Sequence, residues 1–572
     1  MSCCNSNCNH DPCGSSFNQS LTRAAQYAQY AQTQANKSES LWEEFNALYL
    51  GAFAVAPTQD NQGNPLQVGA LYWNTGASEL YAWNGLAWVT ATGFNEFTPF
   101  LATGSTTPRN LATRMADVVN VKDFGAVGDG VTDDTAAFIN AFSSVIASGG
   151  GTIFVPDGIY SIRQKITVTC NAQQHITLTG CGRYQSTLKF GGAADLGISF
   201  ISTSLSNNQL PSFEVTGIGI IASRDNVGTA LSFDYANSNN IDATVNLSNI
   251  FIGQDVDNPS ESGSGYGYWS RGIYCNNCRN GEIQNLHFFG EMNKAPNLTS
   301  SGITLSGEST SFVISSTLIL ESTTGIYITG TTEGVYVHNS DIVGVYYGVY
   351  YNIASGAEPQ LTVTDSHINA QNAGVWTVNV QQSVIANCLI YANSWLSTSS
   401  WPAWTGVLFQ GPNSRYNKVI GCTFAKENQR TGDTTTAIDF NAGSHYSATG
   451  NHFFGFNGNQ LTYGIVVRAG VSECIIGDDN IFNYVTGKTS ISPTALKISD
   501  QPLIRSGTGV YANGATVTFD QAFPNNAYSV TANHNGTSIT TIVSTSSLTT
   551  TGFVVNHNGA GNIAINWIAT GK

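Results

Sequence analysis

The feature that most constrains the fold of this chain is an internal repeat between residues 270 and 485. Similar segments recur every 23 to 32 residues, and each carries a glycine or alanine at the same point: Gly272, Gly302, Gly325, Gly348, Gly374, Gly406, Ala437 and Gly464. An isoleucine or valine follows each of these small residues. A repeat of this length is typical of a solenoid, in which each repeat forms one coil.

A second apolar position recurs once in each repeat, in the segments NLHFF, STLIL, NSDIV, DSHIN, NCLIY, GCTFA and GNHFF. The fourth residue of each segment is apolar: Phe288, Ile319, Ile342, Ile368, Ile390, Phe424 and Phe453. In a stack of parallel strands about 4.8 Å apart, equivalent residues lie above one another and form an interior ladder. The sequence therefore predicts a mainly β fold, a parallel β-helix with two apolar ladders.

One convincing helix stands directly before the β region, in the stretch VVNVKDFGAVGDGVTDDTAAFINAFSSVIASGGGTIFVPDGIYSI. Phe138, Phe142 and Val145 share one face of this helix. Thr132 or Asp133 can cap its start, and three glycines follow its end. A lone helix before a long β region predicts a cap over the open end of a solenoid.

This stretch keeps the order and spacing of DFGAxGDGxTDDTxA followed by GGGxIxxPxGxY. In this it resembles the opening of the pectate-lyase-like, right-handed parallel β-helix of bacteriophage tailspikes and related polysaccharide-processing proteins. The resemblance implies a right-handed coil, a homotrimer and a glycan ligand on the bacterial surface. It assigns no chemistry to the stretch itself. Turn formation and helix capping account for Asp129, Asp133 and Asp134 better than metal binding does.

The chain divides into four segments. Residues 1–50 are expected to form an anchor with a helical stem, 51–107 a small β module with a linker, 108–500 the capped β-helix, and 501–572 a C-terminal β domain. The small module resembles the particle-proximal module of phage tail fibres, so the N-terminus is expected to bind tail or adaptor proteins. The last segment resembles small β-sandwich tips of phage fibres, with trimer clamping ranked before receptor contact.

The stem shows small and aromatic residues at spacings of three, four and seven, among them Tyr27, Ala31, Phe45 and Leu48. Such spacing favours a short bundle formed with other copies of the chain over a helix packed on its own domain. In the small module, the aromatic residues are interpreted as the core of a domain too small for aliphatic residues alone.

Composition limits the partners of the protein. A net charge of −15 argues against nucleic acid. No apolar run is long enough to span a membrane, and no secretory signal starts at Met1. The expectation is synthesis in a host cytoplasm, assembly into a virion tail and contact with capsule, exopolysaccharide or lipopolysaccharide.

The 11 cysteines fall into two groups. Seven lie scattered in the β region and are interpreted as small buried apolar residues. The rest form an N-terminal cluster with one histidine: Cys3, Cys4, Cys8, His10 and Cys13. This cluster matches no standard ligand spacing, so an anchoring tail with free thiols is favoured over a metal site or disulfide knot. No cofactor is expected.

Ligand contacts are predicted on the outer surface of the coils. Tyr327, Tyr350 and Trp376 occupy equivalent outward positions in successive coils and should form an aromatic strip at the strand spacing. Such a strip suits sugar rings, and it equally suits an interface between subunits. Long insertions are the other place where binding usually resides, and their tryptophans are further candidates: Trp269, Trp395, Trp401 and Trp404.

Glycan cleavage normally needs two carboxyl groups, or a base for an elimination. Glu321, Asp341 and Asp365 are expected near one corner of three consecutive coils, with His367 beside Asp341. These four residues are the catalytic candidates for a hydrolase or lyase. The alternative is structural, because Asp365 occupies a column of asparagines that suits turn formation. The poor supply of paired carboxyl groups also keeps a non-enzymatic adhesin fibre as the alternative function.

Overall fold

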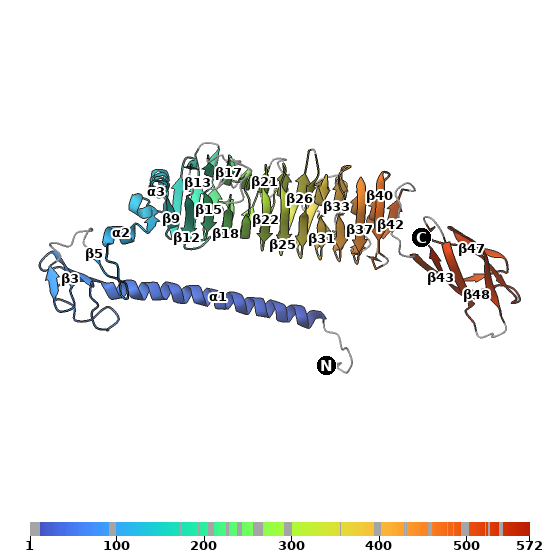
Figure 1. Ribbon diagram of the computed structural model, residues 1–572, viewed down its shortest axis with the longest axis horizontal. Helices are drawn as coiled ribbons and strands as arrows, with labels where there is room; N and C mark the ends of the chain where they lie inside the picture. Colours follow the sequence, from blue (N-terminus) through green and yellow to red (C-terminus); the bar gives the residue numbers. More distant parts are fainter. Residues whose placement is uncertain are drawn as a thin grey trace. The chain divides into compact units, whose positions relative to one another are not determined.

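The computed structural model describes residues 12–571 except for a set of short stretches. These are 91–98, 172–173, 193–194, 204–210, 225–227, 237–242, 256–266, 291–299, 355, 394–401, 428–429, 431, 456–459, 478, 484, 493–502, 521, 524–526 and 537–540. The chain forms two compact units, Met1–Asp117 and Val118–Lys572. Figure 1 shows the elements of each.

The second unit contains a sheet of 34 strands, from β7 (Val118–Asn120) to β42 (Val485–Ile491), whose pairings are parallel. Each strand pairs with a strand of the next coil, as in the series β21 (Ser301–Ser306), β24 (Thr324–Thr329) and β26 (Asp341–Asn352). The arrows lie side by side along the coil stack in Figure 1. The parallel β-helix expected from the repeat is confirmed.

Both predicted ladders are present in the register of the strands. Ile303, Ile326, Val349, Val375 and Val407 pair in succession, and all are fully buried. The second ladder pairs in the same way and is also fully buried: Phe288, Ile319, Ile342, Ile368, Ile390, Phe424 and Phe453. The two ladders supply much of one continuous core along the β-helix.

Packing between these ladders accounts for the repeated small residue, which is glycine in every coil of the repeat but that of Ala437. A Cβ on Gly374, in β29 (His367–Val378), would lie 2.5 Å from Cγ2 of Ile390 and 2.6 Å from the carbonyl oxygen of Gly406. The glycine of one coil therefore contacts both the backbone of the next coil and the side chain of the second ladder. Any larger residue must displace one of them.

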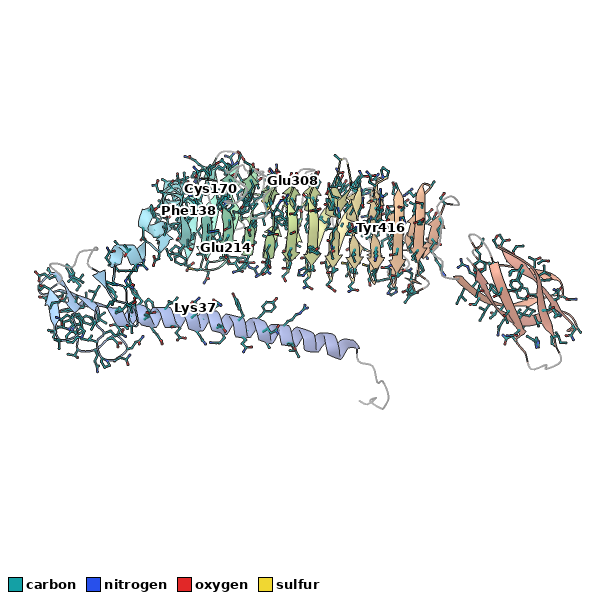
Figure 2. The ribbon with its side chains drawn as sticks, in the orientation of Figure 1. Lys37, Phe138, Cys170, Glu214, Glu308 and Tyr416 are labelled. Carbon is teal, nitrogen blue, oxygen red and sulfur yellow. The ribbon has the colours of Figure 1, made fainter. Side chains whose placement is uncertain are left out.

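The helix α3 (Thr135–Ala147) closes the end of the β-helix beside β9 (Gly150–Val155), as Figures 1 and 2 show. Phe138, Phe142 and Val145 are buried, which confirms the predicted cap. The N-cap position is occupied by Asp134, which makes no side-chain capping bond, while Asp133, one of the two predicted caps, accepts a hydrogen bond from the first amide of the helix. The carboxylate of Asp134 instead accepts hydrogen bonds from the backbone amides of Val127, at 2.6 Å, and Gly128.

Asp129 and Asp133 also bond locally, in support of their interpretation as turn-forming residues. The Asp129 carboxylate accepts hydrogen bonds from the backbone amides of Val131 and Thr132. Asp133 accepts one from the amide of Thr135, at the first residue of α3. Backbone donors thus occupy the carboxylates that a metal ion would need.

The first unit contains α1 (Pro12–Leu48) and a sheet of β1 (Tyr49–Phe53), β2 (Leu71–Asn74), β3 (Glu79–Trp83) and β4 (Trp88–Thr90). Tyr72 is buried in this module, with ring centroids 4.6 Å from Trp88 and 5.4 Å from Tyr81. Trp83 packs on the same core, so the predicted aromatic core is present except for Trp73, which is exposed. On α1, large apolar side chains remain exposed in the single chain, including Tyr27 and Trp42.

The C-terminal residues form two antiparallel sheets that share a core. One sheet contains β43 (Leu503–Tyr511), β48 (Ile563–Gly571) and β45 (Ala527–His534), and the other β44 (Ala515–Thr518), β47 (Gly552–His557) and β46 (Val543–Thr549). Phe519, Phe553 and Trp567 meet between them. The expected C-terminal β domain is thus a small sandwich.

Two further expectations concern cysteines and membranes. Six of the seven described cysteines are buried and none is in a disulfide, but Cys181 is exposed and does not fit the predicted apolar role. It lies just beyond β12 (His175–Gly180), where the chain turns. Within the described part of the chain, no helix is long and apolar enough to cross a membrane.

Candidate functional site: the outer face of the β-helix

The predicted aromatic strip is a stack of three rings, here termed the aromatic column. Tyr327, Tyr350 and Trp376 pair in register on β24, β26 and β29. The ring centroids of Tyr327 and Tyr350 are 5.4 Å apart and those of Tyr350 and Trp376 are 4.5 Å apart, with interplanar angles of 26° and 29°. All three rings are half-buried. The geometry predicted from the sequence is therefore present.

Tyr347 packs against the column from the neighbouring outward position, with its ring centroid 5.5 Å from those of Tyr350 and Trp376. Burial raises the pKa of both Tyr347 and Tyr350. Their hydroxyls therefore stay protonated at neutral pH and keep a hydrogen-bond donor for a ligand.

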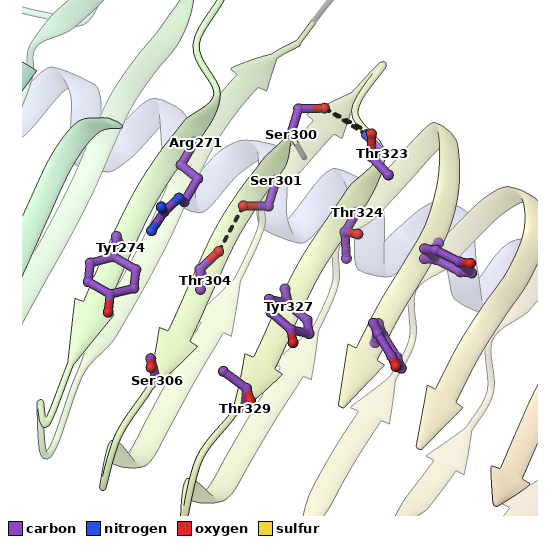
Figure 3. Close-up of a pocket in the computed structure, with 12 residues that line it drawn as sticks. Arg271, Tyr274, Ser300, Ser301, Thr304, Ser306, Thr323, Thr324, Tyr327 and Thr329 are labelled. Atoms are coloured by element: carbon purple, nitrogen blue, oxygen red, sulfur yellow. Dashed lines mark hydrogen bonds between the residues drawn. The ribbon is translucent and has the colours of Figure 1, made fainter. Parts of the chain in front are cut away.

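A surface hollow with a volume of about 510 Å³ adjoins the column and is here termed the hydroxyl hollow (Figure 3). Serine and threonine hydroxyls dominate its lining, with Arg271 and Tyr274 at one end and the column tyrosines at the other. Two hydroxyl pairs lie within it, Ser301 to Thr304 at 2.7 Å and Ser300 to Thr323 at 3.2 Å. A lining of this composition offers many donors and acceptors for the hydroxyl groups of a ligand.

A second hollow, of about 460 Å³, contains three of the four catalytic candidates and is here termed the acidic hollow. Nδ1 of His367 lies 3.5 Å from Oδ1 of Asp341, which its strand register places alongside it. The carboxylate of Asp365 accepts a hydrogen bond of 3.5 Å from the side-chain amide of Asn387. The structure thus brings Asp341, Asp365 and His367 together.

Asp365 has a left-handed backbone conformation, with φ of 52°. The asparagines in the equivalent position of other coils share it: Asn285, Asn339 and Asn387. Asparagine and aspartate tolerate this conformation better than most residues. The turn-forming interpretation of Asp365 therefore agrees with the backbone, and it does not conflict with a second role for an exposed carboxylate.

Glu321 does not join the acidic hollow. The register pairs Leu318 with Asp341, so Glu321 lies three residues further along, at the next corner beside Gly344. The prediction that it shares a corner with Asp341 and Asp365 was wrong, because the short strand β23 (Leu318–Leu320) separates the two turns. Oε2 of Glu321 is buried without a hydrogen-bond partner, and burial raises the pKa of the carboxyl group.

The structure corrects two of the predicted ligand contacts. Trp269 and Trp404 are 0% and 1% exposed. Trp269 packs edge-on against Phe190, with ring centroids 5.4 Å apart, and Trp404 starts β33 (Trp404–Gln410) with its side chain turned into the core. Both sit where an insertion rejoins the coil, Trp269 two residues before β19 (Arg271–Asn276) and Trp404 at the first residue of β33. Trp395 and Trp401 lie outside the described residues.

No metal centre is found in the described residues, where no three His, Cys, Asp or Glu side chains gather in a suitable group. The side chains of the N-terminal cysteine cluster, Cys3 to Cys13, lie outside the described set.

The described coils form a capped parallel β-helix with an aromatic column on its outer face. Residues 118–375 of this β-helix match the family of rhamnogalacturonase A/epimerase, pectate lyase-like proteins. Residues 503–572 match the C-terminal region of the putative gp53-like tail fiber proteins. The Dettilon tailspike protein has the same fold, with a TM-score of 0.50 and 13% identity over 81% of this chain and 96% of that one.

Similarity to curated proteins is confined to short stretches. Mannuronan C5-epimerase AlgE5 of Azotobacter vinelandii is 33% identical over 110 residues, which cover 19% of this chain and 11% of that enzyme. The preneck appendage protein of Bacillus phage PZA is 35% identical over 104 residues, which cover 17% of this chain and 11% of that protein. The chain thus spans about a tenth of the length of these relatives.

Proposed function

We propose that this chain is a tail spike or tail fibre protein that attaches a bacteriophage to its host by binding a surface polysaccharide. The aromatic column beside the hydroxyl hollow carries the proposal. Flat rings pack against the apolar C–H faces of sugars, and the adjacent hydroxyls can replace the water that the sugar hydroxyls lose. The tail-fibre match of the C-terminal residues and the similarity to a phage appendage protein support the assignment to a virion tail.

The same proposal includes cleavage of the bound glycan, with the acidic hollow as the reacting site. Asp341 and Asp365 supply two carboxyl groups, and the imidazole of His367 beside Asp341 supplies a base. Two carboxyl groups suit hydrolysis, and a carboxylate–histidine pair suits proton abstraction in an elimination. The second candidate function is an adhesin that binds without cleaving, which the left-handed turn position of Asp365 favours.

Self-association into a homotrimer belongs to the proposal as well. Exposed apolar side chains of α1 support it, since Tyr27, Tyr30, Leu41 and Trp42 are between 60% and 68% exposed in the single chain. A helix with such side chains gains stability when other copies cover them. The N-terminal unit would then attach the trimer to other tail proteins.

Binding is tested with the full chain on a panel of purified bacterial capsular polysaccharides and O-antigen lipopolysaccharides. Trp376→Ala removes one ring of the column and should weaken binding about fivefold, since stacking on a ring contributes on the order of 1 kcal/mol. Tyr184→Ala is the matched control, because Tyr184 is 63% exposed outside the column. Equal loss in both variants would refute the column as the binding surface.

Cleavage is tested on any polysaccharide that binds, by measuring chain length and the release of oligosaccharides. Asp341→Asn and Asp365→Asn should abolish release while binding persists. Ultraviolet absorbance of an unsaturated sugar would indicate elimination, and its absence together with new reducing ends would indicate hydrolysis. Binding by the wild-type chain without any chain shortening would leave the adhesin as the function.

A further inference from the structure

The aromatic column has a gap one coil wide. The outward positions of five successive coils pair in register as Tyr274, Thr304, Tyr327, Tyr350 and Trp376. Rings occupy four of these positions, and threonine occupies the second. Because neighbouring strands lie about 4.8 Å apart, Tyr274 and Tyr327 stand roughly 9.6 Å apart across Thr304.

A space of this width accepts one ring between two others. Stacked rings in proteins prefer centroid separations of about 4.5–7 Å, and the column itself shows 4.5 and 5.4 Å. The faces of Tyr327 and Tyr350 are stacked along the coil axis, so the other face of Tyr327 is directed toward the coil of Thr304. Figure 3 shows Thr304 between Tyr274 and Tyr327.

Packing of the β-helix does not impose a small residue at Thr304. The column accommodates rings in the three following coils at the same strand spacing, so a tyrosine in this position would find a stacking partner in Tyr327. The threonine is therefore a feature that the fold alone does not explain.

The base of the gap is polar. Thr304 and Ser301 are each 5% exposed, and their hydroxyls bond to each other at 2.7 Å. A pair of hydroxyls has two donors and four acceptor lone pairs, and the bond between them uses one of each. One O–H donor and several acceptors therefore remain at the base for a ligand.

The wall formed by Tyr274 is braced by Arg271, whose guanidinium carbon lies 4.9 Å from the centre of the Tyr274 ring. Among the described residues that line the hydroxyl hollow, Arg271 carries the one charge. A cation at this wall disfavours a ring with a free ammonium group and tolerates neutral or acidic rings.

We propose that the gap between Tyr274 and Tyr327 is a subsite for one neutral or acidic pyranose ring of a longer glycan, with one face of the sugar against Tyr327, its far edge toward Tyr274 and its hydroxyls on Thr304 and Ser301. This inference rests on the proposed polysaccharide binding. It adds the place on the β-helix where one sugar unit of the glycan binds. The remaining column rings extend the binding surface along the glycan.

The test is Thr304→Tyr in the full chain, measured on the same panel of capsular polysaccharides and lipopolysaccharides. The added ring extends the column and occupies the subsite, so affinity should fall at least tenfold while the circular dichroism spectrum shows an intact β-helix. Thr304→Ser retains a hydroxyl and the space, and should bind within about twofold of the wild-type chain.

Leu408→Tyr is the matched control. Leu408 pairs with Trp376 in the next coil, so this variant adds a ring at the far end of the column and leaves the gap open. It should bind as tightly as the wild-type chain or more tightly. Undiminished binding by Thr304→Tyr would overturn the subsite and leave the proposed function standing. No binding by the wild-type chain to any polysaccharide of the panel would overturn both.

Discussion

A buried cluster of three charged side chains, Lys426, Arg430 and Asp433, offers a test of how this part of the β-helix is stabilised. The carboxylate of Asp433 is 1% exposed and lies 2.6 Å from Nε of Arg430 and 3.1 Å from Nζ of Lys426. Arg430 also donates hydrogen bonds to the carbonyl oxygens of Asn393 and Pro402, at 2.9 and 2.6 Å. Asp433 thus neutralises Arg430, and Arg430 links the backbone of Asn393 to that of Pro402.

Asp433→Asn keeps the shape of this side chain and removes its charge. Two cations, with side chains 0% and 5% exposed, then lose the carboxylate that both contact. Breaking a buried ion pair from one side costs about 3–5 kcal/mol, because the remaining charge has already lost its hydration. At about 1.4 kcal/mol for each factor of ten, the local opening equilibrium should shift by roughly two to four powers of ten.

Native-state hydrogen exchange measures this effect locally, which suits a solenoid whose coils open in parts. Amides of β33 and of β36 (Thr435–Phe440) should lose protection by that factor. Asp439→Asn is the control: Asp439 is 3% exposed, but its partner Arg468 is 52% exposed and can be hydrated again. In the control variant, the free energy of local opening should fall by about 1 kcal/mol or less. Equal losses in the two variants would refute the assignment of Asp433 as the group that compensates the buried cations.

Two further predictions concern the coil stack and a buried acid. Gly374→Ala should lower the free energy of unfolding by about 1–3 kcal/mol. Gly302→Ala should lower it by less, because the added Cβ would lie 2.8 Å from its nearest atom there and 2.5 Å at Gly374. Urea unfolding of both variants measures which of them is less stable. Burial raises the pKa of Glu321 above its ordinary 4.5, so ionising it destabilises the fold as pH rises. Glu321→Gln should therefore raise the melting temperature at pH 8 and leave it unchanged below pH 4, and a variant less stable than wild type at pH 8 would contradict the buried, unpartnered state of this carboxyl group.

The coil stack was predictable because its signal is local and repeated. Each repeated small residue precedes an isoleucine or valine, as at Gly374 and Val375, and the pair returns in every repeat although the repeat length varies. A parallel stack converts equal position in the repeat into vertical contact, so the ladders and the aromatic column followed from the repeat alone.

The tryptophans were misplaced for the opposite reason. Trp269 and Trp404 belong to polar insertions of unequal length, where no repeat assigns an inward or outward position. Only the packed structure shows that both side chains are buried. Glu321 was misplaced in a similar way, because the sequence does not show that a strand of three residues separates its turn from that of Asp341.

The sequence by itself determined the architecture of this protein, since a repeated pattern of small, apolar and outward residues has one consistent arrangement as stacked coils. The tertiary structure alone decided where the surface is hollow and which charges are buried. Those features depend on contacts between coils more than 20 residues apart in sequence, as for Thr304 between Tyr274 and Tyr327. The gap at Thr304 forms only because the neighbouring coils place Tyr274 and Tyr327 on either side of it.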